Sequence, residues 1–253
     1  MRVFITGASS GIGAALAAHY AARGARLGLV ARRAETLAEV GRKLPGEPVL
    51  YAADVADARA MQDAAQDFMA RFGVPDIVIA NAGVSVGTLT EHAEDIAVFG
   101  SVLQTNVVGL AATFHPFVAP MRAAGRGRLA GIASVAGVRG IPGAGAYSAS
   151  KAAAIAYLEA LRVELRPSGV RVVTVCPGYV TTPMTAVNRY RMPFILPADV
   201  AARRIARVID AGRAYAVVPW QMALVARTMR LLPNAVYDRL FRCAGRKPRG
   251  LKL

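Results

Sequence analysis

The sequence is poor in cysteine and histidine, and neither residue type is clustered. Its 253 residues contain two cysteines, Cys176 and Cys243, which are far apart and lack the spacing of metal ligands. This argues against a disulfide framework and for a reducing compartment, so we expect a cytoplasmic protein. The scattered histidines His19, His92 and His115 predict no metal site.

The sequence also lacks long apolar runs and has few acidic side chains relative to basic ones. No uninterrupted run of 18 apolar residues occurs, so a membrane-spanning helix is not expected. No secretory signal precedes the first predicted strand. Only 16 acidic residues stand against 31 Lys and Arg, which gives a formal net charge of +15. Such a charge favours anionic partners, namely phosphate-bearing cofactors, acidic lipid surfaces or nucleic acid.

What the chain does contain is a regular alternation of short β-branched runs and longer alanine-rich segments. We expect strands at residues 3–6, 26–31, 48–52, 76–80, 128–133, 170–175 and 215–218. Helices are expected at 11–23, 34–44, 59–72, 95–123, 147–167 and from 197. This order predicts an α/β fold, a doubly wound, Rossmann-type parallel sheet of seven strands with helices on both faces. We expect one domain over residues 1–219 and a helical, basic extension over 220–253.

A glycine-rich turn joins the first strand to the first helix. It reads Thr6-Gly7-Ala8-Ser9-Ser10-Gly11-Ile12-Gly13, a Gly-x-x-x-Gly-x-Gly spacing. Small residues let the backbone approach a phosphate, and the helix N-terminus offers N–H groups and a positive dipole end. A tight turn alone would also explain the glycines. Its place at the first strand–helix junction favours a cofactor site.

The end of the second strand bears on which cofactor is bound. In doubly wound folds an acidic residue near this point binds the ribose hydroxyls of NAD, whereas a nearby arginine accommodates the 2′-phosphate of NADP. Here Ala31 is followed by Arg32 and Arg33. Both arginines could be solvated, but cations at a helix N-terminus oppose its dipole, so a phosphate partner explains them better. We therefore expect NADP, with Ser10 adding a hydrogen bond to the same phosphate.

Tyr147 and Lys151 form a second candidate feature. Residues four apart on a helix lie on one face, so the phenol and the ammonium are neighbours. A phenol has a pKa near ~10, which an adjacent cation lowers, so the pair suits a general acid/base. Taken alone, the pair is also explained by an aromatic packing edge and a solvated charge.

Together these residues resemble the short-chain dehydrogenase/reductase family over about residues 1–220. Each matching segment lies at the carboxyl end of a predicted strand or on the following helix, where open α/β sheets bind ligands. The sequence departs slightly from the family's pattern at Ala80, where members of the family frequently have a second asparagine. In chain order the matching segments are Thr6-Gly7 with Gly11-Ile12-Gly13, Asp54-Val55, Asn81-Ala82-Gly83, Asn106, Ser134, Tyr147 with Lys151, and Pro177-Gly178-Tyr179-Val180-Thr181-Thr182.

The resemblance implies roles for four catalytic residues. Ser134 would hydrogen-bond the substrate oxygen and Tyr147 would transfer its proton. Lys151 would lower the pKa of Tyr147 and bind the nicotinamide ribose, and Asn106 would hold a water that links Lys151 to solvent. A homo-dimer or homo-tetramer is also implied.

The resemblance further implies a set of cofactor contacts. Asp54 would meet the adenine, Asn81 and Gly83 the adenosine side, and Val180 and Thr182 the carboxamide end. The full set is Gly7, Ser9, Ser10, Gly11, Ile12, Gly13, Arg32, Arg33, Asp54, Val55, Asn81, Ala82, Gly83, Tyr147, Lys151, Pro177, Gly178, Val180 and Thr182.

The substrate side is less defined. Residues 184–196 are expected to form a loop or lid over the substrate, and their apolar members suggest a lipophilic substrate: Val187, Tyr190, Met192, Phe194, Ile195 and Leu196. Arg189 and Arg191 are either solvated or meet an acidic group of the substrate.

The extension is basic and amphipathic. Residues 213–253 hold nine Lys and Arg and one acid, Asp238, a net charge of 9 − 1 = +8. We expect a helix over 220–232, a break at Pro233 and a second helix capped by Asn234. Apolar arcs flanked by arginine fit docking on an anionic membrane surface, and equally a cover over the substrate cleft or a subunit interface. Nucleic-acid binding is disfavoured because aromatic residues are not interleaved with the basic ones.

The leading hypothesis is an NADP-dependent oxidoreductase that transfers a hydride to or from a carbonyl or hydroxyl group of a lipophilic substrate. The alternative is a non-catalytic NADP-binding protein docked on a membrane or a partner through its basic tail. The complete set of four catalytic residues favours the enzyme. The sequence does not identify the substrate.

Overall fold

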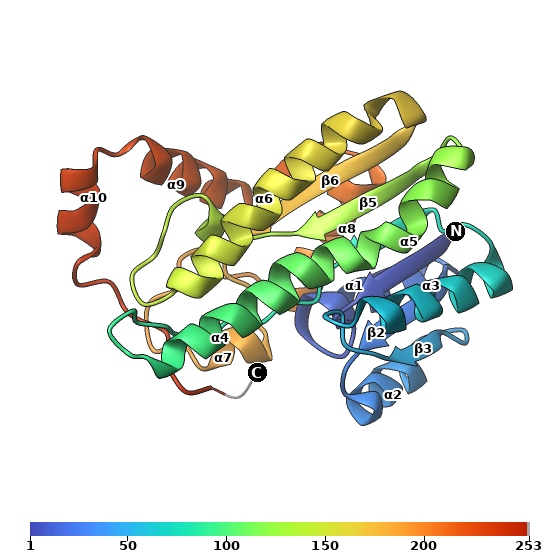
Figure 1. The fold of residues 1–253 in the computed structure, drawn as a ribbon, viewed down its shortest axis with the longest axis horizontal. Coiled ribbons are helices and arrows are strands. Elements are labelled where there is room, and N and C mark those ends of the chain that lie inside the picture. Colours follow the sequence, from blue (N-terminus) through green and yellow to red (C-terminus); the bar gives the residue numbers. More distant parts are fainter. Residues whose placement is uncertain (252–253) are drawn as a thin grey trace.

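The computed structural model describes residues 1–251 and contains a seven-stranded parallel sheet (Figure 1). The strand order is β3-β2-β1-β4-β5-β6-β7. Successive strands are therefore added toward one edge of the sheet from β1 to β3 and toward the opposite edge from β4 onward. Open α/β sheets bind ligands at such a switch point. The strands are β1 (Arg2–Thr6), β2 (Arg26–Ala31), β3 (Val49–Ala52), β4 (Ile77–Ala80), β5 (Gly127–Ile132), β6 (Val170–Pro177) and β7 (Tyr215–Val218). This confirms the predicted fold class.

Helices cover both faces of the sheet (Figure 1). One core, with Leu16, Tyr20 and Ile205, lies under α1 and α8; the other, with Phe68 and Phe114, lies under α3, α5 and α6. Because both faces are covered, strands such as β4 are buried along their whole length and read as continuous apolar runs. The helices of the domain are α1 (Gly11–Ala21), α2 (Ala34–Arg42), α3 (Ala58–Phe72), α4 (Glu94–Leu103), α5 (Gly109–Ala123), α6 (Gly145–Leu165), α7 (Pro183–Ala186) and α8 (Ala198–Asp210).

The helical run Glu94–Ala123 is interrupted by a π-helical turn, Gln104–Val108. The run has 30 residues and contains an 18-residue window with a mean hydropathy of 1.5, so by length and composition it could span a membrane. Phe114 and Phe117, however, are fully buried against the sheet. Core packing therefore accounts for part of its apolar character, and the expectation of no spanning helix stays a prediction.

The segment between β6 and α8 differs in part from the expected loop. It contains the short helix α7, which begins with a capping box: the Thr182 N–H donates to the Thr185 hydroxyl at 3.0 Å. The Thr185 hydroxyl in turn donates to the Val180 carbonyl at 2.6 Å. These contacts fix the start of the segment that was predicted to be a lid.

The extension forms two helices, α9 (Trp220–Leu231) and α10 (Asn234–Phe241), at one end of the molecule (Figure 1). The expected cap by Asn234 is wrong, because Pro233 occupies the N-cap position. The Asn234 side chain instead accepts a hydrogen bond from Arg139 at 2.9 Å. The broad apolar arc predicted for α9 is divided, since Met222 and Met229 are buried whereas Leu224 and Leu231 are exposed.

Candidate active site

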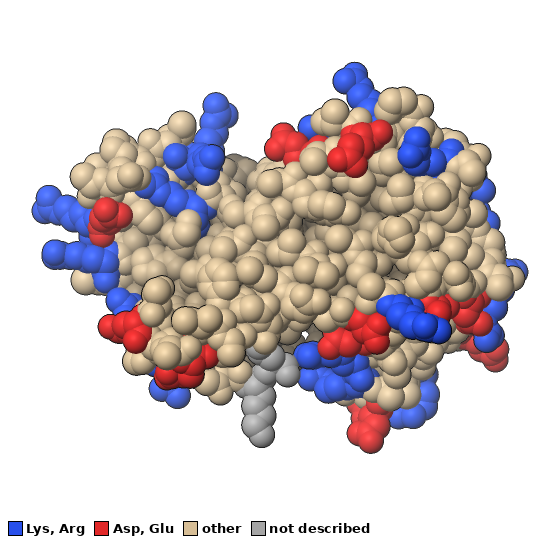
Figure 2. Space-filling model, in the orientation of Figure 1, with Lys and Arg blue, Asp and Glu red and all other residues tan. Residues whose placement is uncertain are grey.

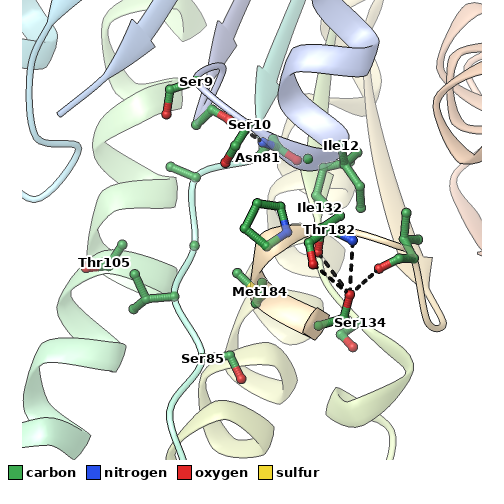
Figure 3. Close-up of a pocket in the computed structure, with 18 of the residues that line it drawn as sticks. Ser9, Ser10, Ile12, Asn81, Ser85, Thr105, Ile132, Ser134, Thr182 and Met184 are labelled. Atoms are coloured by element: carbon green, nitrogen blue, oxygen red, sulfur yellow. Dashed lines mark hydrogen bonds between the residues drawn. The ribbon is translucent and has the colours of Figure 1, made fainter. Parts of the chain in front are cut away.

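A cleft of about 810 Å³ lies across the carboxyl ends of the strands. Figure 3 shows Ser9, Ser10 and Asn81 near one end and Ser85, Ser134 and Met184 near the other. Every predicted cofactor-binding or catalytic residue lines this cleft except Gly13 and Asn106. Ala31 and the loop residues Met184, Thr185 and Val187 line it too, as do residues that the sequence did not single out: Ala53, Val84, Ser85, Val86, Thr105, Ile132, Ala133, Pro183 and Leu251. Most are chain neighbours of predicted residues, but Leu251 carried no sequence signal.

The glycine turn between β1 and α1 is closely packed. Gly7 has φ +66, and a Cβ on it would lie 2.7 Å from the Ala82 Cα. A Cβ on Gly13 would lie 2.2 Å from the Gly7 carbonyl oxygen. Gly13 therefore shapes the turn by allowing close approach, and does not itself line the cleft.

Asn81 holds the same turn against the end of β4. Its Nδ2 donates to the carbonyl oxygens of Thr6 at 3.0 Å and Gly7 at 3.2 Å. Its backbone N–H donates to the Thr6 hydroxyl at 3.2 Å. Asn81 lies at the cleft, as expected, but its amide N–H groups bind protein carbonyls and fix the glycine turn.

The end of β2 places two arginines at the cleft. Ala31, Arg32 and Arg33 all line it. The Arg32 guanidinium lies 3.7 Å from the carboxylate of Asp54, and both side chains are partly exposed. Asp54 also accepts a hydrogen bond from the Ala56 N–H at 2.9 Å. The predicted adenine contact and the predicted phosphate contact are thus neighbours.

Ser134, Tyr147 and Lys151 meet at the floor of the cleft. Ser134 follows β5, and its hydroxyl accepts from the Ala136 N–H at 3.1 Å. Tyr147 and Lys151 lie one turn apart on α6, with the Lys151 nitrogen 5.8 Å from the centre of the tyrosine ring. Lys151 is buried and donates to the carbonyl oxygen of Ile132 at 2.8 Å. The structure therefore brings the predicted acid/base pair and the predicted oxygen-binding serine together.

Burial dominates the titration of this pair. It raises the pKa of Tyr147, while a hydrogen bond with Ser134 acts in the opposite direction. Burial also lowers the pKa of Lys151 to about 8. The net direction for Tyr147 is thus opposite to the expected lowering, because desolvation disfavours the phenolate. Ser134, rather than Lys151, is the side chain that opposes this effect.

Asn106 lies behind the cleft, in the π-helical turn. Its Oδ1 accepts from the Val84 N–H at 2.8 Å, and its Nδ2 donates to the Val84 carbonyl and the Ser150 hydroxyl. A Cβ on Gly83 would lie 3.1 Å from this Oδ1 and 3.4 Å from the Lys151 nitrogen. Asn106 therefore positions the cleft wall beside Lys151, and π-helical turns are frequent at functional sites.

The substrate end of the cleft is apolar. Val86, Met184, Val187 and Leu251 line it together with Ser85. Of the apolar loop residues expected to face the substrate, only Val187 lines the cleft. The exposed Arg189 and Arg191 do not line the cleft, so they supply no contact with an acidic group there.

Leu251 reaches the cleft because the chain after α10 crosses its rim. We call residues 245–251 the C-terminal strap. In this strap the Pro248 carbonyl oxygen accepts a hydrogen bond from the Gly87 N–H at 3.0 Å. Lys247 donates to the Met184 carbonyl at 2.8 Å. Arg249 pairs with Asp95 at 2.7 Å and with Glu94 at 2.9 Å. The extension therefore reaches the rim of the cleft through its strap, whereas the described residues of α9 and α10 do not line it.

Comparison with known proteins agrees with this geometry. Residues 1–192 match the family described as short chain dehydrogenase. An uncharacterized oxidoreductase of Myxococcus xanthus is 39% identical over 239 residues, 92% of this chain and 93% of the relative. The 11-beta-hydroxysteroid dehydrogenase-like 2 of Arabidopsis thaliana is 35% identical over 92% of this chain and 78% of its own length.

A solved structure gives the same result. The crystal structure of levodione reductase superposes with a TM-score of 0.77 at 28% identity, covering 88% of this chain and 97% of the other. The chain therefore belongs to the short-chain dehydrogenase/reductase family and is an oxidoreductase that acts on CH–OH groups.

Proposed function

We propose that the protein is an NADP(H)-dependent reductase or alcohol dehydrogenase of lipophilic molecules, with Tyr147 as its general acid/base. The observation that carries the proposal is the single cleft that joins Arg32 and Arg33 to Ser134, Tyr147 and Lys151. One end of the cleft thus suits a phosphate, and the other suits proton transfer. This polarity is what a nicotinamide dinucleotide requires.

The residues at the cleft fit such a cofactor. The turn at Gly7 and Gly11 has φ of +66 and +56, and a Cβ on Gly11 would come 3.0 Å from Thr182 at the other side of the cleft. The first N–H groups of α1 have no helical acceptor and suit a pyrophosphate. Val180 and Thr182 would hold the carboxamide, and Lys151 the nicotinamide ribose. When bound, the cofactor supplies or accepts the hydride.

The side chains at the floor of the cleft handle the oxygen and its proton. As a carbonyl is reduced, negative charge develops on its oxygen, and hydroxyl donors from Ser134 and Tyr147 stabilise it. Tyr147 then gives its proton to that oxygen, and the reverse reaction returns it. A cationic Lys151 favours the resulting phenolate. Its lowered pKa, about 8, means that the ammonium form predominates only below that pH.

The preference for NADP rests on charge at the adenosine end. Ala31 leaves β2 without an acid at the position that would bind ribose hydroxyls, and Arg32 and Arg33 line the cleft beside it. The ion pair with Asp54 orients Arg32 along the cleft wall. A 2′-phosphate would meet one or both guanidinium groups, which bind phosphate through several N–H donors.

The lipophilic substrate is supported by the apolar lining at Val86, Met184, Val187 and Leu251. It is also supported by the relatives named hydroxysteroid dehydrogenases. Such a lining binds hydrocarbon by removing its surface from water and leaves Ser134 and Tyr147 as the polar groups for the reacting oxygen.

The test is Tyr147→Phe, which keeps the ring and removes only the phenolic oxygen. We expect a loss of about 10²–10⁴-fold in the oxidation of NADPH by lipophilic ketones and aldehydes, with cofactor binding retained. Arg33→Ala should weaken NADPH binding and leave NADH binding nearly unchanged. If wild type and Tyr147→Phe are equally inert across a broad panel while NADPH binds, the proposed activity is wrong.

We further propose a cytoplasmic homo-oligomer. Figure 2 shows a wide region without charged side chains over α4, α5 and α6. Ile96, Phe99, Val108 and Val163 are exposed on these helices and the turn between α4 and α5. An apolar face of this kind marks a subunit contact. Phe99→Arg should lower the mass measured by light scattering to that of a smaller species.

A further inference from the structure

The two helices of the extension present apolar side chains that no other described residue covers. Trp220 is 70% exposed, Leu224 64% and Leu231 73%. These three positions are separated by four and seven residues, so they lie on one face of α9. Val236 and Leu240, four apart, form a similar exposed face on α10.

These side chains are exposed although α9 itself packs against the domain. The opposite face of α9 is packed, with Met222 and Ala226 buried in a cluster with Val135, the residue after Ser134. A Cβ on Gly178 would lie 2.6 Å from the Met222 side chain. The helix therefore contacts the wall of the active site on one side and faces solvent with large apolar groups on the other.

Arg139 fastens the junction of the two helices. Its guanidinium donates to the Met229 and Leu232 carbonyl oxygens at 2.5 Å and 2.6 Å and lies over the Tyr237 ring at 3.9 Å. The Tyr237 hydroxyl donates to the carbonyl of Gly140 at 2.5 Å. The loop that follows Ser134 thus holds α9 and α10 in place, and the exposed apolar surface is preformed.

The same surface is cationic. Residues 220–243 contain four arginines and one acid, a net charge of 4 − 1 = +3. All four arginines are exposed, and Figure 2 shows Lys and Arg side chains projecting from this end of the molecule. Arg227 lies on the same face of α9 as Leu224 and Leu231, since the spacings are three and four.

An anionic lipid surface matches both properties. It offers hydrocarbon to the leucines, an interface to the tryptophan and phosphates to the arginines. A second copy of this chain would instead bring two arginine-rich surfaces together, with only Asp238 on each to offset them. Charge complementarity therefore selects the bilayer.

We propose that α9 and α10 dock on the surface of an anionic lipid bilayer through Trp220, Leu224, Leu231, Val236 and Leu240, with the neighbouring arginines binding lipid phosphates. The loop after Ser134 and the wall at Gly178 then lie next to the membrane. This geometry would draw a lipophilic substrate from the bilayer; that consequence alone rests on the proposed function, whereas the docking does not.

Trp220 provides the test, because it is the only tryptophan in the chain. Its emission should shift to the blue on addition of phosphatidylcholine vesicles containing 30% phosphatidylglycerol, and brominated lipid should quench it. Pure phosphatidylcholine vesicles should bind much less, and 0.5 M salt should weaken binding. These measurements need neither cofactor nor substrate, so failure of docking is distinguishable from failure of the proposed activity.

Two variants separate the apolar and charged contributions. Leu224→Ser with Leu231→Ser should weaken partitioning at least about tenfold, because two large apolar side chains no longer enter the lipid. Arg239→Gln with Arg242→Gln should weaken it about fivefold for each arginine at low salt. Arg204→Gln with Arg207→Gln, which removes two exposed arginines of α8, is the matched control and should change partitioning little.

Three results would overturn the proposal. The first is an unchanged Trp220 emission with anionic vesicles. The second is an equal loss of binding in the α8 control, which would indicate attraction by net charge alone. The third is a blue shift that grows with protein concentration in the absence of lipid, which would assign the surface to a second copy of the chain.

Discussion

Lys247 in the C-terminal strap is expected to destabilise the protein at neutral pH. The residue is 8% exposed, and its described side-chain hydrogen bond goes to the Met184 carbonyl rather than to a carboxylate. Burial lowers its pKa from 10.5 to about 8. Each pKa unit corresponds to about 1.4 kcal/mol, so the charged form carries a penalty of roughly 3 kcal/mol in the folded state at pH 7.

The sign of the pH dependence follows from linkage. Between about pH 8 and 10.5 the unfolded chain keeps the proton that the folded chain has lost, so stability rises with pH in this window. The penalty should fall from roughly 3 kcal/mol at pH 7 to about 1.5 kcal/mol at pH 9.5. Below pH 8 the penalty is present in full.

Lys247→Met removes the charge and keeps most of the volume. Loss of the hydrogen bond to Met184 costs about 1 kcal/mol, so the variant should be more stable than wild type by about 1–2 kcal/mol at pH 7. The advantage should vanish or reverse near pH 9.5. Urea unfolding at both pH values gives the difference, and exchange of the Gly87 amide hydrogen, bonded to Pro248, reports on the strap itself.

Lys43→Met is the control, since Lys43 is exposed at the end of α2. Its stability difference from wild type should be the same at pH 7 and pH 9.5. If Lys247→Met is less stable than wild type at pH 7, or if its difference does not depend on pH, burial of an uncompensated ammonium in the strap is refuted.

Two further predictions concern the turn and the strap. Gly13→Ala should destabilise the protein by about 1–3 kcal/mol and weaken binding of nicotinamide cofactor, because the new Cβ overlaps the Gly7 carbonyl. Gly100→Ala, in α4 with no atom of residues 1–251 within 4 Å of the added Cβ, should instead stabilise it slightly in the same calorimetric scan. Arg249→Gln, which breaks the pair with Asp95, should raise KM for lipophilic substrates several-fold and leave cofactor affinity unchanged. Glu94→Gln removes only an exposed partner and should change KM little, and a rise in cofactor Kd with Arg249→Gln would contradict the assignment to the substrate end.

The convergence of these residues on one cleft was predictable because the fold places them without further information. Gly7, Asp54, Asn81, Ser134 and Gly178 each follow a strand, and parallel strands end at one edge of the sheet. Periodicity locates the strands, so these residues must converge. What the sequence did not predict is the use of each polar group, such as the amide of Asn81 binding the glycine turn.

The substrate end was not predictable in the same way. Arg249 meets Asp95 across 154 positions, and Arg139 meets Asn234 across 95. No sequence periodicity relates such residues, because the path of an irregular segment is set by its tertiary contacts and not by a repeating pattern of side chains. The division of α9 into a packed and an exposed apolar face was missed for a related reason: amphipathic analysis finds apolar positions but does not say which of them another element covers.

The C-terminal strap has a consequence for how this enzyme can diversify. The parallel sheet and its edge are complete at Val218, whereas Leu251 at the substrate end comes from a segment added afterwards in the chain. Changes in that segment alter the shape of the substrate end without touching the glycine turn or the tyrosine–lysine pair. Exchange of the strap and its helices between relatives should therefore alter the part of the substrate end that Leu251 forms, while Val86, Met184 and Val187 keep their places.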